Sequence, residues 1–154
     1  MHSAVLPTPL GFGYCIESSG DAITSGTFRR TNHLTGRFSD PLLREAAAQI
    51  EAYFDRRLRQ FDLPLCLDGT PLQRDAWEAI AQLRFGHFVS YAEVARAINR
   101  PNAHRGVAAA MAKTPTGLLI PAHRVLGSDG RIKGADPRSI RAQLVRFERF
   151  RYSR

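Results

Sequence analysis

The sequence predicts a mixed α+β fold in two parts, an α/β part over residues 1–67 and a mainly helical part over residues 68–154. In the first part, short apolar stretches separated by Gly, Ser and Thr indicate strands. In the second, two capping boxes followed by apolar residues at helical spacing indicate helices. The net charge of +8 also divides the chain, because residues 67–154 carry fifteen lysines and arginines against seven acids.

The first part is expected to hold three strands and a helix. Residues 12–16 and 22–28 are the first two strands, joined by a polar turn. The pair Asp40-Pro41 begins a helix, because Asp accepts from a free amide and Pro is tolerated in the first turn. Residues 61–67 form the last strand and lead into the second part.

The second part is expected to begin as a helix-turn-helix. Thr70 starts a helix that ends before Gly86, and Ser90 starts a short one. A further helix of small residues follows over residues 103–112, with Asn102 as its expected cap. Two short helices joined by a tight turn are typical of DNA-binding proteins in which the second helix enters a groove.

The remaining residues predict a small wing and a last helix. Residues 118–120 form a short buried strand, and residues 125–126 and 131–132 flank a glycine-containing turn. The pair Asp136-Pro137 begins the last helix, which has a basic outer face. The second part is therefore expected to be a winged helix-turn-helix.

Composition and motifs exclude several classes of protein. Apolar content of 44% and charged content of 23% are typical of a globular protein. No apolar run approaches the ~18 residues of a membrane span, and no secretory segment is expected, so we expect a cytoplasmic protein without a membrane partner. Cys15 and Cys66 do not predict a disulfide framework. Without metal-ligand spacing or a nucleotide fingerprint, neither a metal nor a cofactor is expected.

The positive charge indicates the class of partner. An excess confined to the part with the helix-turn-helix pattern favours a polyanion, most simply double-stranded DNA. General solubility is the alternative interpretation of the same charge.

Three motifs resemble the O6-alkylguanine-DNA alkyltransferases, also called methylated-DNA–protein-cysteine methyltransferases. Residues 121–125, Pro-Ala-His-Arg-Val, resemble the Pro-Cys-His-Arg-Val of that family. Residues 86–91 are similar to its Gly-x-x-x-Ser-Tyr turn, and residues 103–107 to its Ala-Ala-Arg-Ala-Val recognition helix. The likeness covers nearly the whole chain, but Ala122 stands where the family has its reactive cysteine.

The resemblance implies a ribonuclease-H-like N-terminal domain over residues 1–67 and a winged helix-turn-helix DNA-binding domain over residues 68–154. Because the methyl group of Ala122 has no lone pair with which to attack an alkyl carbon, the chain is identified as an alkyltransferase-like member and is predicted not to be an enzyme. His123 and Glu148 match the pair that deprotonates the thiol through a water in the family. Here they are interpreted as a vestigial pocket or as a structural hydrogen-bonded pair.

The predicted DNA-binding residues are Tyr91, Ala103, His104, Arg105 and Arg124. The resemblance implies that Arg105 enters the base stack and holds the gap left by a flipped nucleotide. A solvated helix arginine or a phosphate contact is the alternative for Arg105. Tyr91 matches the family tyrosine that helps to rotate the phosphate of the target nucleotide.

The predicted lesion pocket comprises Tyr91, Thr114, Pro121, Ala122 and Ala135. Thr114 replaces the asparagine that ties two motifs together in the family. Near Ala135 the aromatic residue that covers the flipped base in the family is missing. The pocket is therefore expected to be roomy enough for adducts bulkier than methyl.

The sequence thus predicts a monomeric damage-recognition protein that binds duplex DNA containing O6-alkylguanine and flips the damaged base. The resemblance implies that it marks or shields the lesion for nucleotide excision repair, whose proteins would be its partners. One alternative is an alkyltransferase whose nucleophilic cysteine was replaced by alanine through engineering, or that uses another nucleophile. The other is a sequence-specific winged-helix regulator, which would prefer one undamaged sequence.

Overall fold

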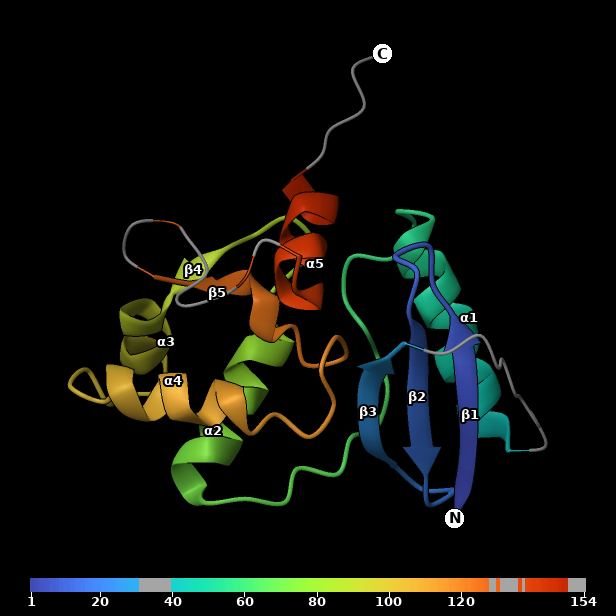
Figure 1. The fold of residues 1–154 in the computed structure, drawn as a ribbon. Coiled ribbons are helices and arrows are strands. Elements are labelled where there is room, and N and C mark those ends of the chain that lie inside the picture. The colour runs from blue at the N-terminus through green and yellow to red at the C-terminus, as the bar shows by residue number, and fades with distance from the viewer. Residues whose placement is uncertain (31–39, 128–129, 131–135, 137, 150–154) are drawn as a thin grey trace. The chain divides into compact units, whose positions relative to one another are not determined.

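A computed structural model of the chain describes residues 1–30, 40–127, 130, 136 and 138–149. The chain forms two compact units, and its architecture is mixed α+β (Figure 1). The first unit comprises Met1–Leu67 and Pro115–Leu119, and the second unit comprises Asp68–Thr114 and Ile120–Arg154.

The first unit is a three-stranded antiparallel sheet with one helix. The sheet has the order β1 (His2–Pro7), β2 (Gly13–Ser18), β3 (Ile23–Arg29), and α1 (Pro41–Phe54) packs against β1 and β2 (Figure 1). The strands predicted at β2 and β3 are confirmed, but β1 was not predicted as an element. The strand predicted at residues 61–67 is reduced to one bridge, from Leu65 to Ile23.

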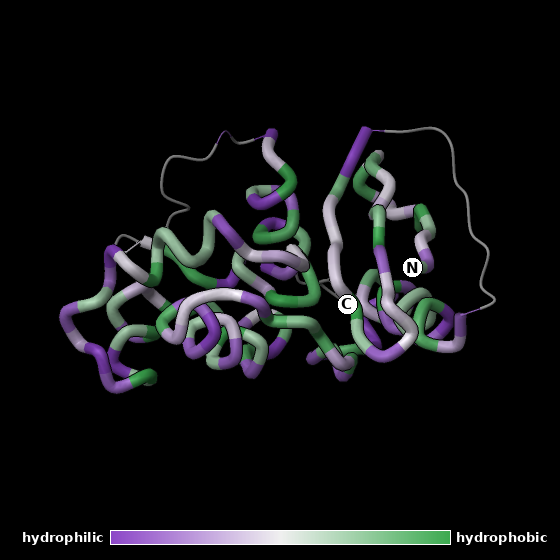
Figure 2. The backbone as a smooth tube through the Cα atoms, turned by 90° about the horizontal axis from the view of Figure 1, so that it is seen from below, coloured by the Kyte–Doolittle hydropathy of each residue, from purple (hydrophilic) through white to green (hydrophobic). Residues whose placement is uncertain are grey.

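Helix α1 begins as the sequence predicts. The Asp40 side chain accepts a hydrogen bond from the Leu42 amide at 3.1 Å, and Pro41 occupies the first turn. Apolar residues recur along one side of α1, and this side is buried. Figure 2 shows the resulting alternation of apolar and polar residues along the helices.

The short segment Pro115–Leu119 is part of the first unit. Thr116 bridges to Gly26, the Gly117 amide donates to the Gly26 carbonyl at 3.1 Å, and the Tyr14 hydroxyl donates to the Gly117 carbonyl at 2.6 Å. Leu118 has a φ of 77°, in the left-handed region, so the chain turns there. The strand predicted at residues 118–120 is therefore wrong.

Close approach of Gly26 to Tyr14 leads to a prediction about stability. A Cβ atom at position 26 would lie 2.0 Å from the Tyr14 hydroxyl oxygen, and Tyr14 is 0% exposed, so neither group has room to move. We expect Gly26→Ala to lower the free energy of unfolding by about 1–3 kcal/mol, measured by urea denaturation. Gly117→Ala is the control, because its Cβ would lie 3.9 Å from the Gly26 carbonyl. Equal stability of the two variants would contradict the prediction.

The second unit is mainly helical. Its helices are α2 (Pro71–Ala81), α3 (Tyr91–Ala97), α4 (His104–Ala112), the 3₁₀ turn η1 (Ala122–Arg124) and α5 (Ile140–Arg149). The capping boxes predicted at Thr70 and Ser90 are both present. The predicted third helix is confirmed as α4, but its N-cap is Ala103, without a side-chain hydrogen bond, so the predicted cap at Asn102 is wrong.

Helix α4 packs tightly on α2. The Trp77 indole donates to the Ala110 carbonyl at 2.9 Å. A Cβ atom at Gly106 would lie 2.6 Å from the Leu72 Cδ2 atom. Small residues on α4 thus permit the close approach, and the opposite side of α4 stays exposed.

The predicted wing differs from the observed pairing. Strands β4 (Val89–Ser90) and β5 (Val125–Leu126) pair in parallel, and residues 131–132 lie outside the described residues. Helix α5 begins at Ile140, after Ser139 accepts from the Ala142 amide at 3.2 Å, and not at Asp136-Pro137 as predicted. Pro137 is not among the described residues.

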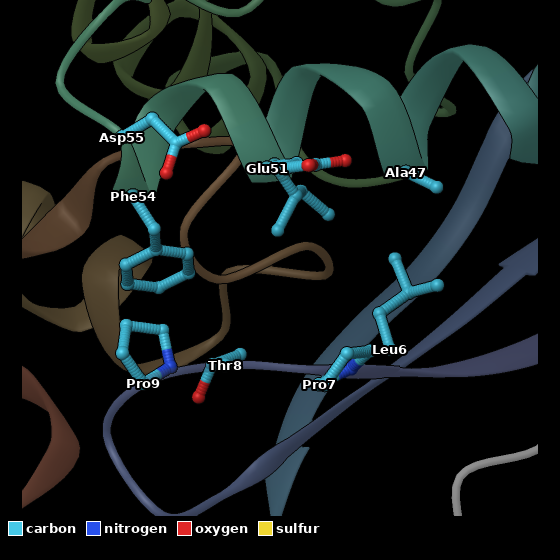
Figure 3. A pocket seen from close by; sticks show the side chains of 9 residues that line it. Leu6, Pro7, Thr8, Pro9, Ala47, Glu51, Phe54 and Asp55 are labelled. Carbon is cyan, nitrogen blue, oxygen red and sulfur yellow. The ribbon is translucent and has the colours of Figure 1, made fainter.

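The first unit also contains a groove of about 620 Å³. Figure 3 shows the Phe54 ring over Pro9 at one end of this groove. None of the lining residues is a predicted DNA-binding or lesion-pocket residue. In the part of the chain that the structure describes, no helix has the length and apolar character needed to cross a membrane.

Candidate lesion pocket and DNA interface

The candidate pocket is built around the turn η1. Pro121 precedes η1 and is buried, Ala122 is half-buried, and the Arg124 amide donates to the Pro121 carbonyl at 2.9 Å. His123 and Arg124 point into the protein and are 2% and 1% exposed. The turn thus leaves the position of the family's nucleophile partly accessible and buries the two residues that follow it.

The Glu148 carboxylate, on α5, is bonded to several donors next to this turn. Arg124 donates to it twice, from Nε at 2.8 Å and from Nη2 at 3.1 Å, and His123 Nε2 is also bonded to it. The Gly86 amide donates to the same carboxylate at 2.9 Å, and Arg124 Nη1 donates to the Leu83 carbonyl at 2.6 Å. One buried acid therefore holds η1, α5 and the segment after α2 together.

Burial and pairing set the protonation of this network. Burial alone raises the pKa of Glu148, but the hydrogen bonds and the charges of His123 and Arg124 lower it to about 2. Burial lowers the pKa of His123, and the hydrogen bond with Glu148 offsets only part of that shift. A neutral imidazole that donates Nε2–H to Glu148 keeps a lone pair on Nδ1, so His123 can accept a proton.

Arg124 requires a correction. It was predicted to contact DNA, but its side chain is 1% exposed and its guanidinium is held by Glu148 and Leu83. A cation engaged in this way inside the protein is not available to a phosphate. We therefore remove Arg124 from the DNA-binding residues and assign it to the support of the pocket.

Arg141, on α5, is a site residue that was not predicted from the sequence. Its Nη2 atom donates to the Ala122 carbonyl at 3.1 Å, to the Tyr91 hydroxyl at 3.3 Å and to the Val125 carbonyl at 3.4 Å. The guanidinium thus links two predicted pocket residues, Tyr91 and Ala122. A signal was present, because Arg141 and Glu148 are seven residues apart and lie on the same side of a helix.

The start of α4 presents the other predicted DNA-binding residues. His104 and Arg105 are exposed in the first turn of α4, and Ala103 is half-buried just before it. In contrast to the buried Arg124, the Arg105 side chain is free to extend toward a ligand.

Two predicted pocket residues remain, Thr114 and Ala135. The Thr114 hydroxyl donates to the Met111 carbonyl at 2.8 Å, so it satisfies a backbone carbonyl at the C-terminal end of α4. Ala135 lies outside the described residues. Among the described residues, no three His, Cys, Asp or Glu side chains come together as a metal site would require.

Comparisons with known proteins show the family of the chain. Residues 71–150 match the family described as 6-O-methylguanine DNA methyltransferase, DNA binding domain. A methylated-DNA–protein-cysteine methyltransferase from Methanosarcina barkeri is 42% identical over 106 residues, which are 68% of this chain and 67% of that protein. The constitutive methyltransferase of this name from Bacillus subtilis is 33% identical over 127 residues, covering 81% and 77%.

A solved structure extends the likeness to both units. The crystal structure of Mycobacterium tuberculosis OGT in complex with DNA superimposes with a TM-score of 0.81 at 28% identity, covering 97% of this chain and 93% of that chain. The match supports the mixed α+β fold with a helical DNA-binding part.

These relatives overturn one prediction. They are named methyltransferases, which are enzymes, so the prediction that this chain is not an enzyme is corrected. That prediction was drawn from a single side chain, Ala122, and the names of these relatives do not support it. The chain belongs to the 6-O-methylguanine DNA methyltransferase family.

Proposed function

We propose that this chain binds duplex DNA, flips O6-alkylguanine into the pocket at Ala122, and marks or shields the lesion for nucleotide excision repair. In this proposal the protein acts as a monomer in the cytoplasm. Residues 68–154 serve as a winged helix-turn-helix domain that holds the DNA, and residues 1–67 form a ribonuclease-H-like domain.

The proposal rests on two residues of the second unit. Arg105 is exposed, and Ala122 is half-buried. Flipping a base leaves a gap in the stack and costs a few kcal/mol, so a side chain that fills the gap makes the flipped state accessible. Arg105 is long, exposed and near the start of a helix that is fixed by its packing on α2. The resemblance implies that a flipped guanine would reach position 122, where the side chain of Ala122 is small and half-buried.

Charge supports duplex DNA as the partner. The excess of eight positive charges lies in residues 67–154, and phosphate contacts from such a surface give strong, salt-dependent binding with little sequence preference. Lesion selectivity would then come from the easier unstacking of a damaged pair and from contacts in the pocket.

The test is a binding titration at fixed salt with two duplexes that differ only in one O6-methylguanine. The proposal expects the modified duplex to bind at least about tenfold more tightly, in line with the few kcal/mol at stake in flipping. Equal affinity for both duplexes would refute the proposal. Strong preference for one undamaged sequence would instead favour the winged-helix regulator. Incision of the modified duplex by purified nucleotide excision repair proteins, with and without the chain, distinguishes marking from shielding.

A second candidate function is alkyl transfer to the protein. The names of the relatives and the intact His123–Glu148 pair favour it, and it would require a nucleophile other than residue 122. Mass spectrometry of the intact chain after incubation with O6-methylguanine DNA tests this candidate. A stable gain of about 14 Da, one methyl group in place of hydrogen, would establish it.

The role of Arg105 leads to a further prediction. We expect Arg105→Ala to weaken binding of the O6-methylguanine duplex by about tenfold more than binding of the undamaged duplex, because it removes the group that stabilises the flipped state. Fluorescence anisotropy with both duplexes measures the two losses.

Arg96→Ala is the matched control for Arg105. Arg96 is an exposed arginine on the neighbouring helix α3, and its loss should weaken both duplexes equally by removing one phosphate contact. If Arg105→Ala weakened the binding of both duplexes equally, Arg105 would be a phosphate contact only, as Arg96 is expected to be.

A further inference from the structure

Strand β1, the turn that follows it and helix α1 form the groove of the first unit. Leu6 and Ile50 line its buried part and are 4% and 2% exposed. The Phe54 ring and Pro9 lie at one end (Figure 3). Typical ligand sites are mostly apolar and measure roughly 300–1,000 Å³, and the volume of this groove is about 620 Å³. The groove therefore has the size and the lining of a binding site.

Among the described residues that line the groove, the charged ones are both acidic, Glu51 and Asp55. Both are exposed, and they are one helical turn apart on α1, so they lie on the same side of the helix (Figure 3). Asp55 also pairs with Arg57 at 3.2 Å, but both side chains are more than half exposed, so this pair is weak. The groove is thus locally acidic in a chain with a net charge of +8, and a cationic ligand is complementary to it.

Strand β1 offers main-chain groups beside the groove. It pairs with β2 on one side, and in the part of the chain that the structure describes no strand pairs with its other side (Figure 1). Such an edge presents amide and carbonyl groups that can pair with an extended peptide. Pro7 has no amide, so this pairing is confined to the residues before it. Because Leu6 and Pro7, the last two residues of β1, also line the groove, a peptide extended along β1 would reach it.

We propose that this groove binds an extended segment of a partner protein in which Lys or Arg stands two positions from a large apolar residue. Alternate side chains of an extended peptide point to the same side, so the apolar side chain enters the groove and the basic ones pair with Glu51 and Asp55. The net charge of +8 repels a basic peptide elsewhere on the chain, so binding depends on this acidic groove. The inference is independent of the proposed function, because no predicted DNA-binding or lesion-pocket residue lines the groove.

The test measures binding of three fluorescein-labelled peptides to the native chain by fluorescence anisotropy, without DNA. The probe is Ser-Lys-Ser-Phe-Ser-Lys-Ser, the second peptide has Ser in place of Phe, and the third has Glu in place of both Lys. We expect the probe to bind at least about tenfold more tightly than either of the others, the scale of burying one large apolar side chain. Equal binding of the probe and either other peptide, or no binding of the probe at about 1 mM, would overturn the inference.

Substitutions of the two acids assign the charge preference to the groove. Glu51→Gln and Asp55→Asn should each weaken binding of the probe by about threefold, as expected for an exposed ion pair. Glu45→Gln is the matched control, because Glu45 is exposed on the same helix, is bonded to Gln49 at 2.9 Å and does not line the groove. An equal effect of all three substitutions would show that the probe responds only to the overall charge, and the inference would fail.

Filling the groove tests the apolar contact. Ala47 lines the groove and is half-buried, so Ala47→Leu should occupy the space of the Phe side chain and weaken binding of the probe by at least about tenfold. Ala48→Leu is the control, because Ala48 is exposed on α1 and does not line the groove. Thermal unfolding shows whether each variant keeps the fold, and the comparison of the three peptides on the native chain requires no variant. Amide hydrogen exchange of β1 should slow when the probe is bound, and unchanged exchange would overturn the pairing along β1.

Discussion

The Ala122→Cys variant is expected to take one methyl group from O6-methylguanine DNA and to keep it on the new cysteine. Burial lowers the pKa of the neighbouring His123, Glu148 orients its ring, and the neutral form of the imidazole keeps a lone pair that can accept the thiol proton. A thiolate at position 122 would then attack the methyl carbon, so that the S–C bond forms as the O6–C bond breaks, and the guanine anion left in the DNA takes up a proton. Intact-mass measurement detects the gain of about 14 Da, and peptide mapping assigns it to residue 122 and not to Cys15 or Cys66, both of which are free thiols.

A second substitution in the same background tests the role of His123. In the Ala122→Cys chain, His123→Gln should slow the methyl transfer by about 100-fold or more, the usual contribution of a general base. The Glu78→Gln substitution on α2 is the control, since Glu78 is exposed and should leave the rate unchanged. An Ala122→Cys chain that binds the lesion but takes up no methyl group would show that the network behind η1 no longer supports chemistry.

Glu148→Gln is expected to destabilise the second unit by about 3–5 kcal/mol, the usual effect of removing one partner of a buried ion pair. The substitution leaves the buried Arg124 cation without its counter-ion and weakens the bonds to His123 and Gly86. Urea denaturation measures the change, with Glu78→Gln again as the exposed control. A loss below about 0.5 kcal/mol, as at ordinary surface positions, would contradict the assignment of Glu148 as the centre of the network.

The stability of the fold at acid pH should also depend on Glu148. The pKa of Glu148 is about 2 in the folded chain against an ordinary value of 4.5, so the unfolded chain binds more protons at this group between these pH values. The stability that Glu148 contributes is therefore complete above about pH 4.5 and is lost as the pH falls toward 2. Glu148→Gln should lack this part of the acid dependence.

Local signals predicted the starts of α1, α2 and α3 but failed for the cap of α4 and the start of α5. The caps at Asp40, Thr70 and Ser90 act over two or three residues, so the sequence contains all the information that they need. The predicted strand over residues 118–120 failed because Leu118 turns with a positive φ, and the contacts that hold this segment come from Gly26 and Tyr14, far away in the sequence.

The sequence indicated only those site residues that lie in a motif or match the family. Ala122 and His123 follow from one run of residues, and Glu148 follows from the resemblance. The burial of Arg124 and the position of Arg141 depend on which side of α5 faces η1, and this packing is visible only in the fold. A motif that contains an arginine does not reveal whether that arginine reaches a phosphate or a buried acid.

The assignment of Pro115–Leu119 to the first unit has a consequence for any attempt to dissect the protein. The polypeptide leaves the helical unit for five residues and returns, so a gene fragment encoding residues 68–154 would carry Thr116 without Gly26 as its bridging partner. Leu118 and Leu119, each 2% exposed in the whole chain, would lose their cover and favour aggregation of the fragment. Loss of the first unit during evolution would therefore require this loop to be shortened or made polar.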